Sequence, residues 1–433
     1  MTELPAHTPD PTLSDEPQQV LRLARAARAV APIAAGLSSA TKNAVLAAAA
    51  QALEDATDAV LKANDADVAA GQRAGMDAGL IDRLRLDATR LRGIADGLRQ
   101  VAGLEDPVGQ VVAGRVLANG IRMRQVRVPL GVMGMVYEAR PNVTVDAFGL
   151  ALKSGNVALL RGSKSARHTN EALVEVLRGV LVDAGLPADL VSLLPSQTHD
   201  SVQALITARG LVDVVIPRGS ARLINAVVEG ASVPAIETGT GNCHLYIDAS
   251  ADLEQAVALL INGKTRRPSV CNATETVLLD SALSDASVRT VATALREAGV
   301  TIHGQVSQWE DRGVDGVVPA TEEDWAEEYL SMDIAAGFVD GVEGAIAHIA
   351  RWSSGHTEAI AARDYAVTQR FAAAVDSAAV NINASTAFTD GEVYGMGAEI
   401  GISTQKLHAR GPMALPELTS TKWILEGDGQ VRP

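Results

Sequence analysis

The residue best suited to chemistry in this chain is Cys271, one of only two cysteines among 433 residues. The segment before it carries three cations, Lys264, Arg266 and Arg267, and a β-branched run at 274–279 follows it. Nearby positive charge lowers the pKa of a thiol, and the thiolate is the nucleophilic form of cysteine. The pattern therefore indicates a reactive thiol at the edge of a strand. The alternative is a small buried side chain, because unbridged cysteine is among the most buried residue types.

Other kinds of site leave little signal in the sequence. No Gly-x-Gly-x-x-Gly motif follows a strand-like run, and Gly239-Thr240-Gly241 is too short to replace it. The eight histidines show no metal-ligand spacing, so we expect no metal ion. No Ser, His and Asp arrangement stands out as a catalytic triad. The remaining features are therefore interpreted around Cys271.

Composition and charge exclude several classes of function. The formal net charge of −15 disfavours nucleic acid or an anionic membrane as the main partner. No apolar stretch reaches the roughly 18 residues that a membrane span needs. The acidic, proline-containing start, up to Pro17, lacks the apolar segment typical of a secretion signal. Two cysteines in a chain of this length argue for a reducing compartment, and we expect the protein in the cytoplasm.

The elements that must position these residues follow from residue patterns. Residues 20–106 have helical spacing and high helix propensity. Residues 111–128 indicate a hairpin around Asn119-Gly120, a pair that suits a type I′ turn. Beyond Gly131, short β runs alternate with helical stretches, which predicts βαβ units and a mainly parallel sheet. The β runs of the first series lie at 132–137, 157–160, 191–194, 212–216 and 233–236, and a second series extends from 244 to about 383.

Longer motifs carry a resemblance to a known family. Residues 128–163 resemble the aldehyde dehydrogenase superfamily, in which a strand ends in Pro-Asn, a helix follows, and a Gly-Asn strand leads to the cofactor. The segments at 139–142, 237–244, 262–272 and 397–412 are similar to the γ-glutamyl phosphate reductases within that superfamily. The superfamily uses a Rossmann-type domain without a Gly-x-Gly-x-x-Gly loop, which accounts for the absence of that motif here.

The resemblance extends over about residues 20–432 and implies an α/β, aldehyde-dehydrogenase-like fold. It comprises a Rossmann-type cofactor domain, an α/β catalytic domain and a small β arm for oligomerisation, preceded by a loose tail. The expected boundaries are 1–17 for the tail, 18–110 and 129–240 for the NADP-binding domain, 241–415 for the catalytic domain, and 111–128 and 416–433 for the arm. The arm implies a homo-oligomer, either a dimer or a tetramer.

The activity implied by the resemblance is the NADPH-dependent reduction of L-glutamyl 5-phosphate to L-glutamate 5-semialdehyde and phosphate, the second step of proline biosynthesis from glutamate. Cys271 matches the nucleophile that forms a thioester, and hydride from the nicotinamide then releases the aldehyde. Asn142 matches the side-chain donor to the tetrahedral oxyanion, with the N–H of Cys271 as the second donor. Without the resemblance, Asn142 would be interpreted as a turn-capping amide after Pro141. A separate glutamate 5-kinase would be a transient partner, because acyl phosphates hydrolyse readily.

The resemblance also implies four cofactor-binding residues. Arg161 and Lys164 match two positions near the adenosine ribose, and a cation at Lys164 favours NADPH over NADH. Ser220, at the start of a predicted helix, matches a position that contacts the pyrophosphate. Glu328 matches the residue that holds the nicotinamide ribose. From local sequence alone, the first two would form an exposed charged turn, Ser220 would be a helix N-cap, and Glu328 would belong to a solvated acidic face.

Cations are the expected ligands of the anionic substrate. Lys264, Arg266 and Arg267 are candidates for binding the substrate phosphate or for activating the thiol, although not all three can face inward in a regular segment. Arg140 is a candidate for binding the substrate carboxylate. The family often has Arg where this chain has Ala387, so the residues that bind the α-amino and α-carboxylate groups stay open.

Two other functions remain open from the sequence. Glu237 lies 34 residues before Cys271, a spacing typical of the general base of hydrolytic aldehyde dehydrogenases, so a hydrolytic enzyme of the same fold is one alternative. A reductase that releases phosphate needs no such base, and Glu237 would then pack or hydrogen-bond at the domain junction. The second alternative is a non-catalytic cofactor-binding or scaffolding protein, in which Cys271 would be unreactive.

Overall fold

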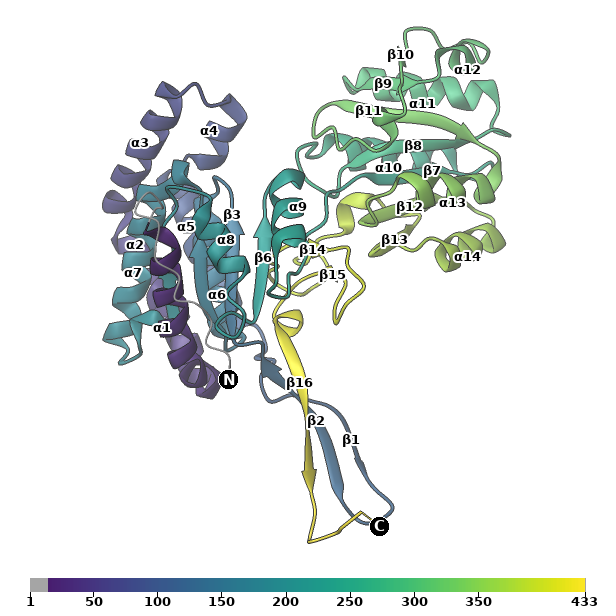
Figure 1. Cartoon of the computed structure of the whole chain (residues 1–433). Coiled ribbons are helices and arrows are strands. Elements are labelled where there is room, and N and C mark those ends of the chain that lie inside the picture. Colours follow the sequence, from purple (N-terminus) through teal and green to yellow (C-terminus); the bar gives the residue numbers. More distant parts are fainter. Residues whose placement is uncertain (1–14, 433) are drawn as a thin grey trace, which may run out of the picture. The chain divides into compact units, whose positions relative to one another are not determined.

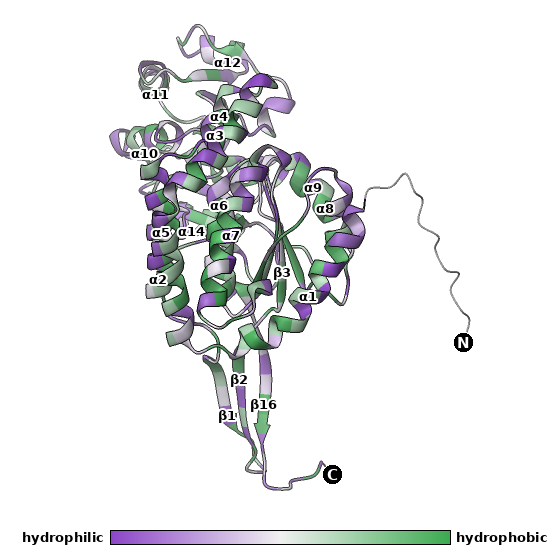
Figure 2. Cartoon of the chain, turned by 90° about the vertical axis from the view of Figure 1, so that its left-hand side faces the viewer, coloured by the Kyte–Doolittle hydropathy of each residue, from purple (hydrophilic) through white to green (hydrophobic). Residues whose placement is uncertain are grey.

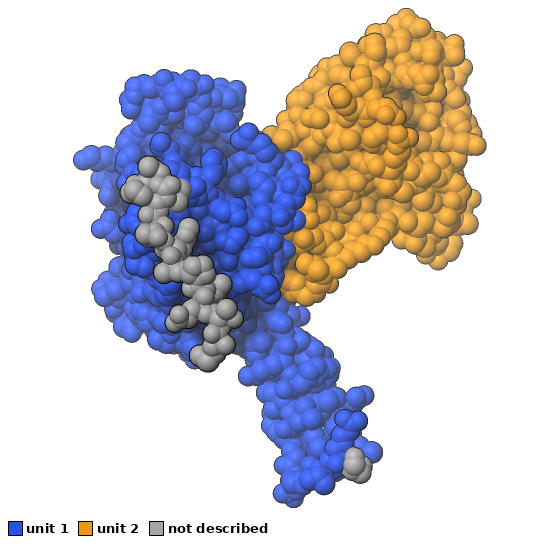
Figure 3. Space-filling model, viewed as in Figure 1, with its two compact units in different colours: residues 1–236, 415–433 blue, residues 237–414 orange. Residues whose placement is uncertain are grey.

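The computed structural model describes residues 15–432. Contacts within the chain divide it into two compact units, which Figure 3 distinguishes by colour. Unit 1 comprises Met1–Ile236 and Leu415–Pro433, and unit 2 comprises Glu237–Ala414. No helix among the described residues is both long and apolar enough to cross a membrane.

Helix α1 (Glu16–Gly36) begins earlier than the sequence suggested, so residues 16 and 17 do not belong to a loose tail. Of the other positions of the expected tail, residues 1–14 lie outside the described residues, and Asp15 is described. A proline in the first turn suits a helix start. The buried carboxylate of Glu16 accepts the N–H groups of Gln197 (2.8 Å) and Thr198 (3.1 Å), and these contacts hold the start of α1 against its own unit.

The core of unit 1 is a parallel sheet with strand order β5-β4-β3-β6. Its strands are β3 (Val132–Tyr137), β4 (Val157–Arg161), β5 (Val191–Leu193) and β6 (Val214–Arg218). These apolar runs are buried on both faces, as is usual for parallel strands. The run at 233–236, expected as a further strand, forms only a bridge between Ala235 and Val215. Pro234 has no N–H group to donate, which limits pairing at this edge.

Helices cover both sides of this sheet, as Figures 1 and 2 show. One side carries α2 (Ser39–Asp55), α5 (Ala88–Gly103), α6 (Pro141–Lys153) and α7 (Arg167–Asp183). The other side carries α1, α8 (Asp200–Ile206) and α9 (Ala221–Gly230). Helix α3 (Thr57–Arg73) packs against α7 and α4 (Ala78–Leu84). Each long helix packs one apolar face against the core. In α5 the residues on this face recur at spacings of three, four and one along the chain, as expected for a helix: Leu91, Ile94, Ala95 and Leu98.

Three antiparallel strands form an arm that projects from the α/β core of unit 1 (Figure 1). They are β1 (Val111–Val116), β2 (Arg122–Pro129) and β16 (Thr419–Glu426), in the order β1-β2-β16. The connection between β1 and β2 is not the expected type I′ turn, because Gly120 has a positive φ (86°) and Asn119 does not. The N–H of Gly120 donates to the carbonyl of Leu117 at 2.9 Å, so one left-handed glycine is sufficient to close the hairpin.

Unit 2 is built on a seven-stranded parallel sheet with the order β10-β9-β11-β8-β7-β12-β13. The strands are β7 (Cys243–Ile247), β8 (Thr274–Asp280), β9 (Thr301–Gly304), β10 (Val318–Pro319), β11 (Asp333–Val339), β12 (Thr357–Ala361) and β13 (Ala379–Ile382). The helices are α10 (Leu253–Thr265), α11 (Asp285–Glu297), α12 (Val306–Glu310), α13 (Gly341–Trp352) and α14 (Tyr365–Ala374). A short antiparallel pair is formed by β14 (Ile402–Ser403) and β15 (Gly411–Pro412).

Alternation along the central strands divides their side chains between two cores of unit 2. In β7, Leu245 and Ile247 pack in the core that includes α10 and α11, whereas Tyr246 packs in the core that includes α13 and α14. In β8, Val277 and Leu278 divide in the same way. Because both faces are covered, every residue of β7 and β8 is buried, including the polar His244, Glu275 and Thr276. The two cores fix the strands and hence the loops at the amino edge of the sheet.

Candidate active site

Cys271 lies in the loop between α10 and β8, where its side chain is half-buried. The strands β7, β8 and β12 are parallel neighbours, so the residues that precede them lie at the same, amino edge of the sheet. Gly241 precedes β7, Cys271 precedes β8, and His356 precedes β12. Ligands of open α/β sheets usually bind at the carboxyl ends of the strands. The fold class alone therefore did not predict the edge on which this loop lies.

The main chain around Cys271 is held by other segments of unit 2. A Cβ atom on Gly241 would lie 1.5 Å from the carbonyl oxygen of Cys271, so only glycine allows this approach. The thiol of Cys243 donates to the same oxygen at 3.1 Å. The amide of Asn272 donates to the carbonyl of Thr389 at 3.0 Å. The nucleophile candidate therefore lies on a supported loop, and neither Gly241 nor Cys243 was identified from the sequence as its support.

The three cations before Cys271 have different environments. Lys264 is fully buried near the end of α10 and forms an ion pair with the buried Glu275 of β8, with Nζ and Oε2 2.5 Å apart. Burial lowers the pKa of Lys264 and raises the pKa of Glu275 to about 7. Arg266 and Arg267 are exposed. The structure therefore pairs Lys264 with a carboxylate that the sequence did not identify, and it leaves two arginines accessible to an anion.

Glu328 is tied to the same glycine that supports the Cys271 loop. Its Oε1 accepts the N–H of Gly241 at 2.7 Å. Burial raises the pKa of Glu328, and the hydrogen bond from Gly241 opposes this effect. Two residues later, Leu330 has a positive φ of 54°, and its N–H donates to Glu275 at 3.3 Å. Glu328 thus lies on a constrained segment next to the Cys271 loop, and not on a solvated acidic face.

Glu237 is the first residue of unit 2 and is half-buried. Its N–H donates to the side-chain oxygen of Gln405 at 3.0 Å. The following residue, Thr238, forms an antiparallel bridge with Ser403 of β14. These contacts anchor the main chain at Glu237 to the segment around β14.

In unit 1, Asn142 lies in the first turn of α6 with an exposed side chain. Its amide donates to the carboxylate of Asp146, one turn further along the helix, at 3.0 Å. Burial raises the pKa of Asp146 to about 6, against the lowering effect of this hydrogen bond. The partner of the Asn142 amide is therefore a carboxylate that the sequence did not identify. Arg140 directly precedes α6, and its N–H donates to the carbonyl of Glu138 at 2.6 Å.

The two cations expected beside the adenosine ribose differ in exposure. Arg161 ends β4 and is buried, and its guanidinium donates to the carbonyl of Thr198 (2.6 Å) and the hydroxyl of Ser201 (3.2 Å). Burial lowers the pKa of Arg161. Lys164, the first residue of a short 3₁₀ helix, is exposed. Arg161 therefore holds the start of α8, and Lys164 is the member of the pair that presents its charge to solvent.

Ser220 is the N-cap residue of α9, and its N–H and hydroxyl both donate to the carboxylate of Glu138, at 3.0 and 2.7 Å. A Cβ atom on Gly219 would lie 2.7 Å from the carboxyl carbon of Glu138, so a glycine is needed for this approach. Helix N-termini attract anions because their N–H groups lack helical partners. The carboxylate of Glu138 therefore occupies the anion-attracting start of α9. The sequence did not indicate this contact, because Glu138 follows β3, far from α9 along the chain.

Several of these groups could hold a nucleotide. Lys164 offers an exposed cation, the start of α9 offers the N–H and hydroxyl of Ser220, and Glu328 offers a carboxylate. Residues 15–432 contain no group of three or more His, Cys, Asp or Glu side chains placed to hold a metal ion. Within unit 1, the cation of Lys164 and the donors of Ser220 are each of a type that suits a phosphate oxygen.

Comparisons with known proteins agree with this architecture. A sequence profile of the aldehyde dehydrogenase family matches residues 12–308. The crystal structure of a γ-glutamyl phosphate reductase from Thermotoga maritima is 41% identical, with a TM-score of 0.94 over 96% of this chain and 100% of that chain. The crystal structure of the γ-glutamyl phosphate reductase from Saccharomyces cerevisiae is 29% identical, with a TM-score of 0.52 over 96% of this chain and 98% of that chain.

A more distant match shows the same fold. A glyceraldehyde-3-phosphate dehydrogenase from Methanocaldococcus jannaschii, complexed with NADP, is 17% identical, with a TM-score of 0.67 over 97% of this chain and 96% of that chain. The family match and the Thermotoga maritima structure confirm the resemblance that the sequence motifs indicated. The chain belongs to the aldehyde dehydrogenase family, and within it to the γ-glutamyl phosphate reductases.

Proposed function

We propose that this chain reduces L-glutamyl 5-phosphate to L-glutamate 5-semialdehyde with release of phosphate, using NADPH, as the second step of proline biosynthesis from glutamate. The observation that carries this proposal is the 41% identity to the Thermotoga maritima γ-glutamyl phosphate reductase over the full length of that protein. The supported loop of Cys271 is consistent with it, because a nucleophile on a well-held main chain suits covalent catalysis.

Cys271 is the proposed nucleophile. Its thiolate sulfur forms a bond to the acyl carbon of the substrate while the carbonyl electrons move onto oxygen. The oxyanion then collapses, the bond from the acyl carbon to the phosphate oxygen breaks, and phosphate leaves with the electron pair. Asn142 is the proposed side-chain donor to the oxyanion, and the N–H of Cys271 is the second donor. One such donor stabilises the transition state by about 3–4 kcal/mol.

NADPH is the proposed reductant: when bound, it would supply the hydride that adds to the carbonyl carbon of the thioester, after which the bond to the Cys271 sulfur breaks and the aldehyde leaves. Lys164 would favour this cofactor over NADH, because a cation attracts the 2′-phosphate that a carboxylate would repel. The donors of Ser220 suit a pyrophosphate oxygen, since they already hold the carboxylate of Glu138. Glu328 is the proposed ligand of the nicotinamide ribose. Arg161 would act on the cofactor only indirectly, because its guanidinium holds the start of α8.

Three arginines are the proposed ligands of the substrate's charged groups: Arg266 and Arg267, which are exposed, and Arg140, which is half-buried. Arg266 and Arg267 would bind the phosphate, since guanidinium groups pair bidentately with phosphate oxygens. Arg140 would bind the substrate carboxylate. Lys264 is less suited to bind substrate directly, because it is buried against Glu275.

The arm suggests how the chain assembles. Its apolar side chains Trp423 and Leu425 lie two residues apart on β16, hence on one face of the arm, and are exposed in the single chain, whereas Val116 of β1 is exposed on the opposite face. Exposed apolar side chains that share one face suit an interaction surface. A homo-oligomer, either a dimer or a tetramer, is therefore proposed to form through the arm. A glutamate 5-kinase is the proposed transient partner, because its acyl phosphate product hydrolyses readily, and the reaction is assigned to the cytoplasm.

The reverse reaction distinguishes this proposal from a hydrolytic aldehyde dehydrogenase. The purified protein would be given glutamate 5-semialdehyde and NADP⁺, with and without inorganic phosphate, and NADPH formation would be followed by absorbance. Turnover that requires phosphate supports the proposal, because phosphate then resolves the thioester. Turnover that is indifferent to phosphate contradicts it, and indicates water as the acceptor, with Glu237 as the candidate base.

Two variants complete the test. Cys271→Ser should abolish turnover, because a serine hydroxyl is a far weaker nucleophile than a thiolate. Glu237→Gln should leave phosphate-dependent turnover nearly unchanged, but it should abolish turnover in a hydrolytic enzyme. A wild-type protein without turnover in either condition would support the non-catalytic alternative.

A further inference from the structure

Cys243, the first residue of β7, is fully buried and has no part in the mechanism described above. Its Sγ lies 3.1 Å from the carbonyl oxygen of Cys271, in a hydrogen bond that the thiol donates. Burial raises the pKa of Cys243 well above its ordinary value, so the thiol keeps the proton that this bond requires. The two cysteines of the chain are therefore connected through the main chain of the nucleophile candidate.

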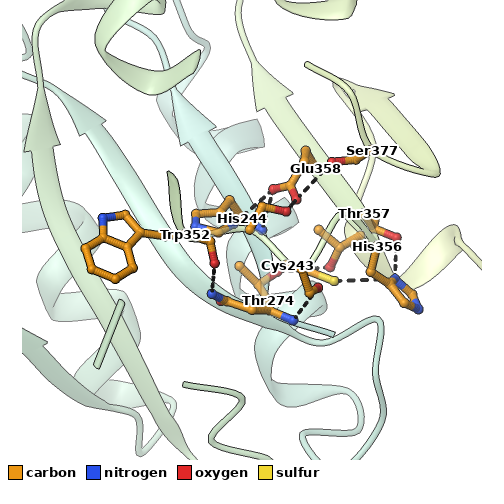
Figure 4. A network of polar contacts seen from close by, with 12 residues as sticks. Cys243, His244, Thr274, Trp352, His356, Thr357, Glu358 and Ser377 are labelled. Carbon is orange, nitrogen blue, oxygen red and sulfur yellow. Dashed lines mark hydrogen bonds and ion pairs between the residues drawn. The ribbon is translucent and has the colours of Figure 1, made fainter. Parts of the chain in front are cut away.

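The Cys243 thiol belongs to a buried chain of polar contacts, part of which Figure 4 shows. Nδ1 of His356 lies 3.6 Å from the Cys243 sulfur and 2.8 Å from the hydroxyl of Thr357. The thiol has one hydrogen, and when it donates that hydrogen to Cys271, its sulfur can accept a hydrogen from Nδ1 of a neutral His356. Contacts on both sides of the sulfur restrict the rotation of the thiol.

An irregularity in the strand pairing places Cys243 at this point. Strands β7 and β8 pair Cys243 with Thr274 and His244 with Thr276, so the register shifts between these two pairs. Such irregularities change the direction of a side chain and are frequent beside active sites. Gly241, two residues before Cys243, lets the neighbouring loop approach closely. The start of β7 is therefore shaped around the Cys271 loop, beyond what a regular strand would require.

We propose that Cys243 is a positioning residue for the nucleophile. Its S–H holds the carbonyl of Cys271, and hence the peptide plane between Cys271 and Asn272, whose side chain is held in turn by Thr389. With that plane held, the Cys271 thiol keeps one direction towards the acyl carbon, and reactions at a well-oriented group are much faster than at a mobile one. The inference rests on the proposed role of Cys271 as the nucleophile.

Alkylation by iodoacetamide in the full-length protein tests the proposal without substrate or cofactor. Because Cys243 is buried, the folded protein should react at Cys271, and Cys271→Ser should remove the reaction. Cys243→Ser keeps a donor and should react at nearly the wild-type rate. Cys243→Ala and Cys243→Val remove the donor and should be alkylated about 5-fold to 100-fold more slowly than wild type. The lower figure corresponds to the loss of one hydrogen bond, and the upper figure to a misplacement of the nucleophile by about 1 Å.

Turnover and stability measurements separate positioning from packing. In the reductase assay, kcat should follow the same order of variants while KM stays nearly constant, because Cys243 has no proposed contact with substrate. The Cys243→Val variant keeps an apolar side chain in the space of the thiol but has no hydrogen-bond donor, so it isolates the effect of the donor from that of packing. Val277→Ala, at a buried position of β8 outside this chain of contacts, serves as the control. It should lower the thermal midpoint and leave the alkylation rate unchanged.

Equal alkylation rates for wild type and Cys243→Val would overturn the proposal. A Cys243→Ser variant as slow as Cys243→Ala would also overturn it, because the donor would then have no effect. A protein that shows the expected order of alkylation rates but no phosphate-dependent turnover would instead overturn the proposed function, and leave the positioning of Cys271 by Cys243 in place.

Discussion

The amide of Asn142 donates to the carboxylate of Asp146 at 3.0 Å across one turn of α6. Helix α5 lies close to this carboxylate, since a Cβ atom on Gly97 would be 3.9 Å from its Oδ1. The positive charge of Arg218 also acts on Asp146 and lowers its pKa. The bond fixes one amide hydrogen of Asn142 and leaves the second directed away from Asp146. The direction of the proposed oxyanion donor therefore depends on the protonation of Asp146.

We expect activity to fall as the pH drops through about 6, where Asp146 gains a proton. Burial raises the pKa of this carboxyl above its ordinary value, so its contribution to stability is present at low pH and is lost as the pH rises through about 6. Asp146→Asn should therefore be at least as thermostable as wild type at pH 8, while its kcat falls. In this variant, kcat/KM should no longer fall as the pH drops through about 6. If it still falls as in wild type, Asp146 is not the group whose protonation lowers activity.

Removal of Lys264 should destabilise unit 2, because it leaves the carboxylate of Glu275 buried without its partner. Loss of one member of a buried ion pair costs about 3–5 kcal/mol. The decrease in the thermal midpoint of Lys264→Met should be larger at pH 8.5 than at pH 6. The raised pKa of Glu275, about 7, means that the carboxyl is neutral at the lower pH and tolerates burial.

The double variant Lys264→Met with Glu275→Leu is the matched control for this pair. Replacing both partners by apolar side chains of similar size is often neutral or stabilising. The double variant should therefore recover most of the thermal midpoint and lose the pH dependence. If the double variant is as unstable as Lys264→Met alone, the unpaired carboxylate of Glu275 does not account for the loss of stability.

Lys164→Glu should shift cofactor preference from NADPH towards NADH. The substitution replaces an exposed cation by a carboxylate, which would repel a 2′-phosphate and accept a bond from a 2′-hydroxyl. The ratio of the Kd values for NADPH and NADH, from fluorescence titration, should rise by at least tenfold, which corresponds to about 1.4 kcal/mol. Arg167→Glu, at an exposed cation three residues later, should leave the ratio near wild type. Equal shifts in both variants would indicate a general charge effect.

Glu138→Gln should tighten the binding of NADPH. The carboxylate of Glu138 now accepts the N–H and hydroxyl of Ser220, the donors proposed for the pyrophosphate, so the two anions compete for them. A neutral amide is a weaker acceptor than a carboxylate. A lower Kd for NADPH in Glu138→Gln, with a higher Kd in Ser220→Ala, would support this competition. Weaker binding in Glu138→Gln would show that Glu138 assists the cofactor instead.

The sequence by itself determined the local elements of the fold and the candidate nucleophile. The apolar run at 132–137 and the β-branched run at 274–279 became β3 and β8, because apolar and β-branched residues both favour strands that are buried on both faces. The hairpin at 111–128 was also predicted, although not its turn, since both a type I′ turn and a turn with one left-handed glycine accept Asn119-Gly120. The motifs at 128–163, 237–244, 262–272 and 397–412 together indicated the family, which the comparisons confirm.

Only the tertiary structure decided which side chains meet. Lys264 could have faced solvent like Arg266, and its burial against Glu275 depends on how α10 lies over β8. Cys243 reaches the Cys271 carbonyl from 28 residues away, and Glu138 reaches Ser220 from 82 residues away. Regular strands and helices have a period that can be recognised in a sequence. Loops and strand ends have none, so the partners of their side chains are set by the packing of distant segments.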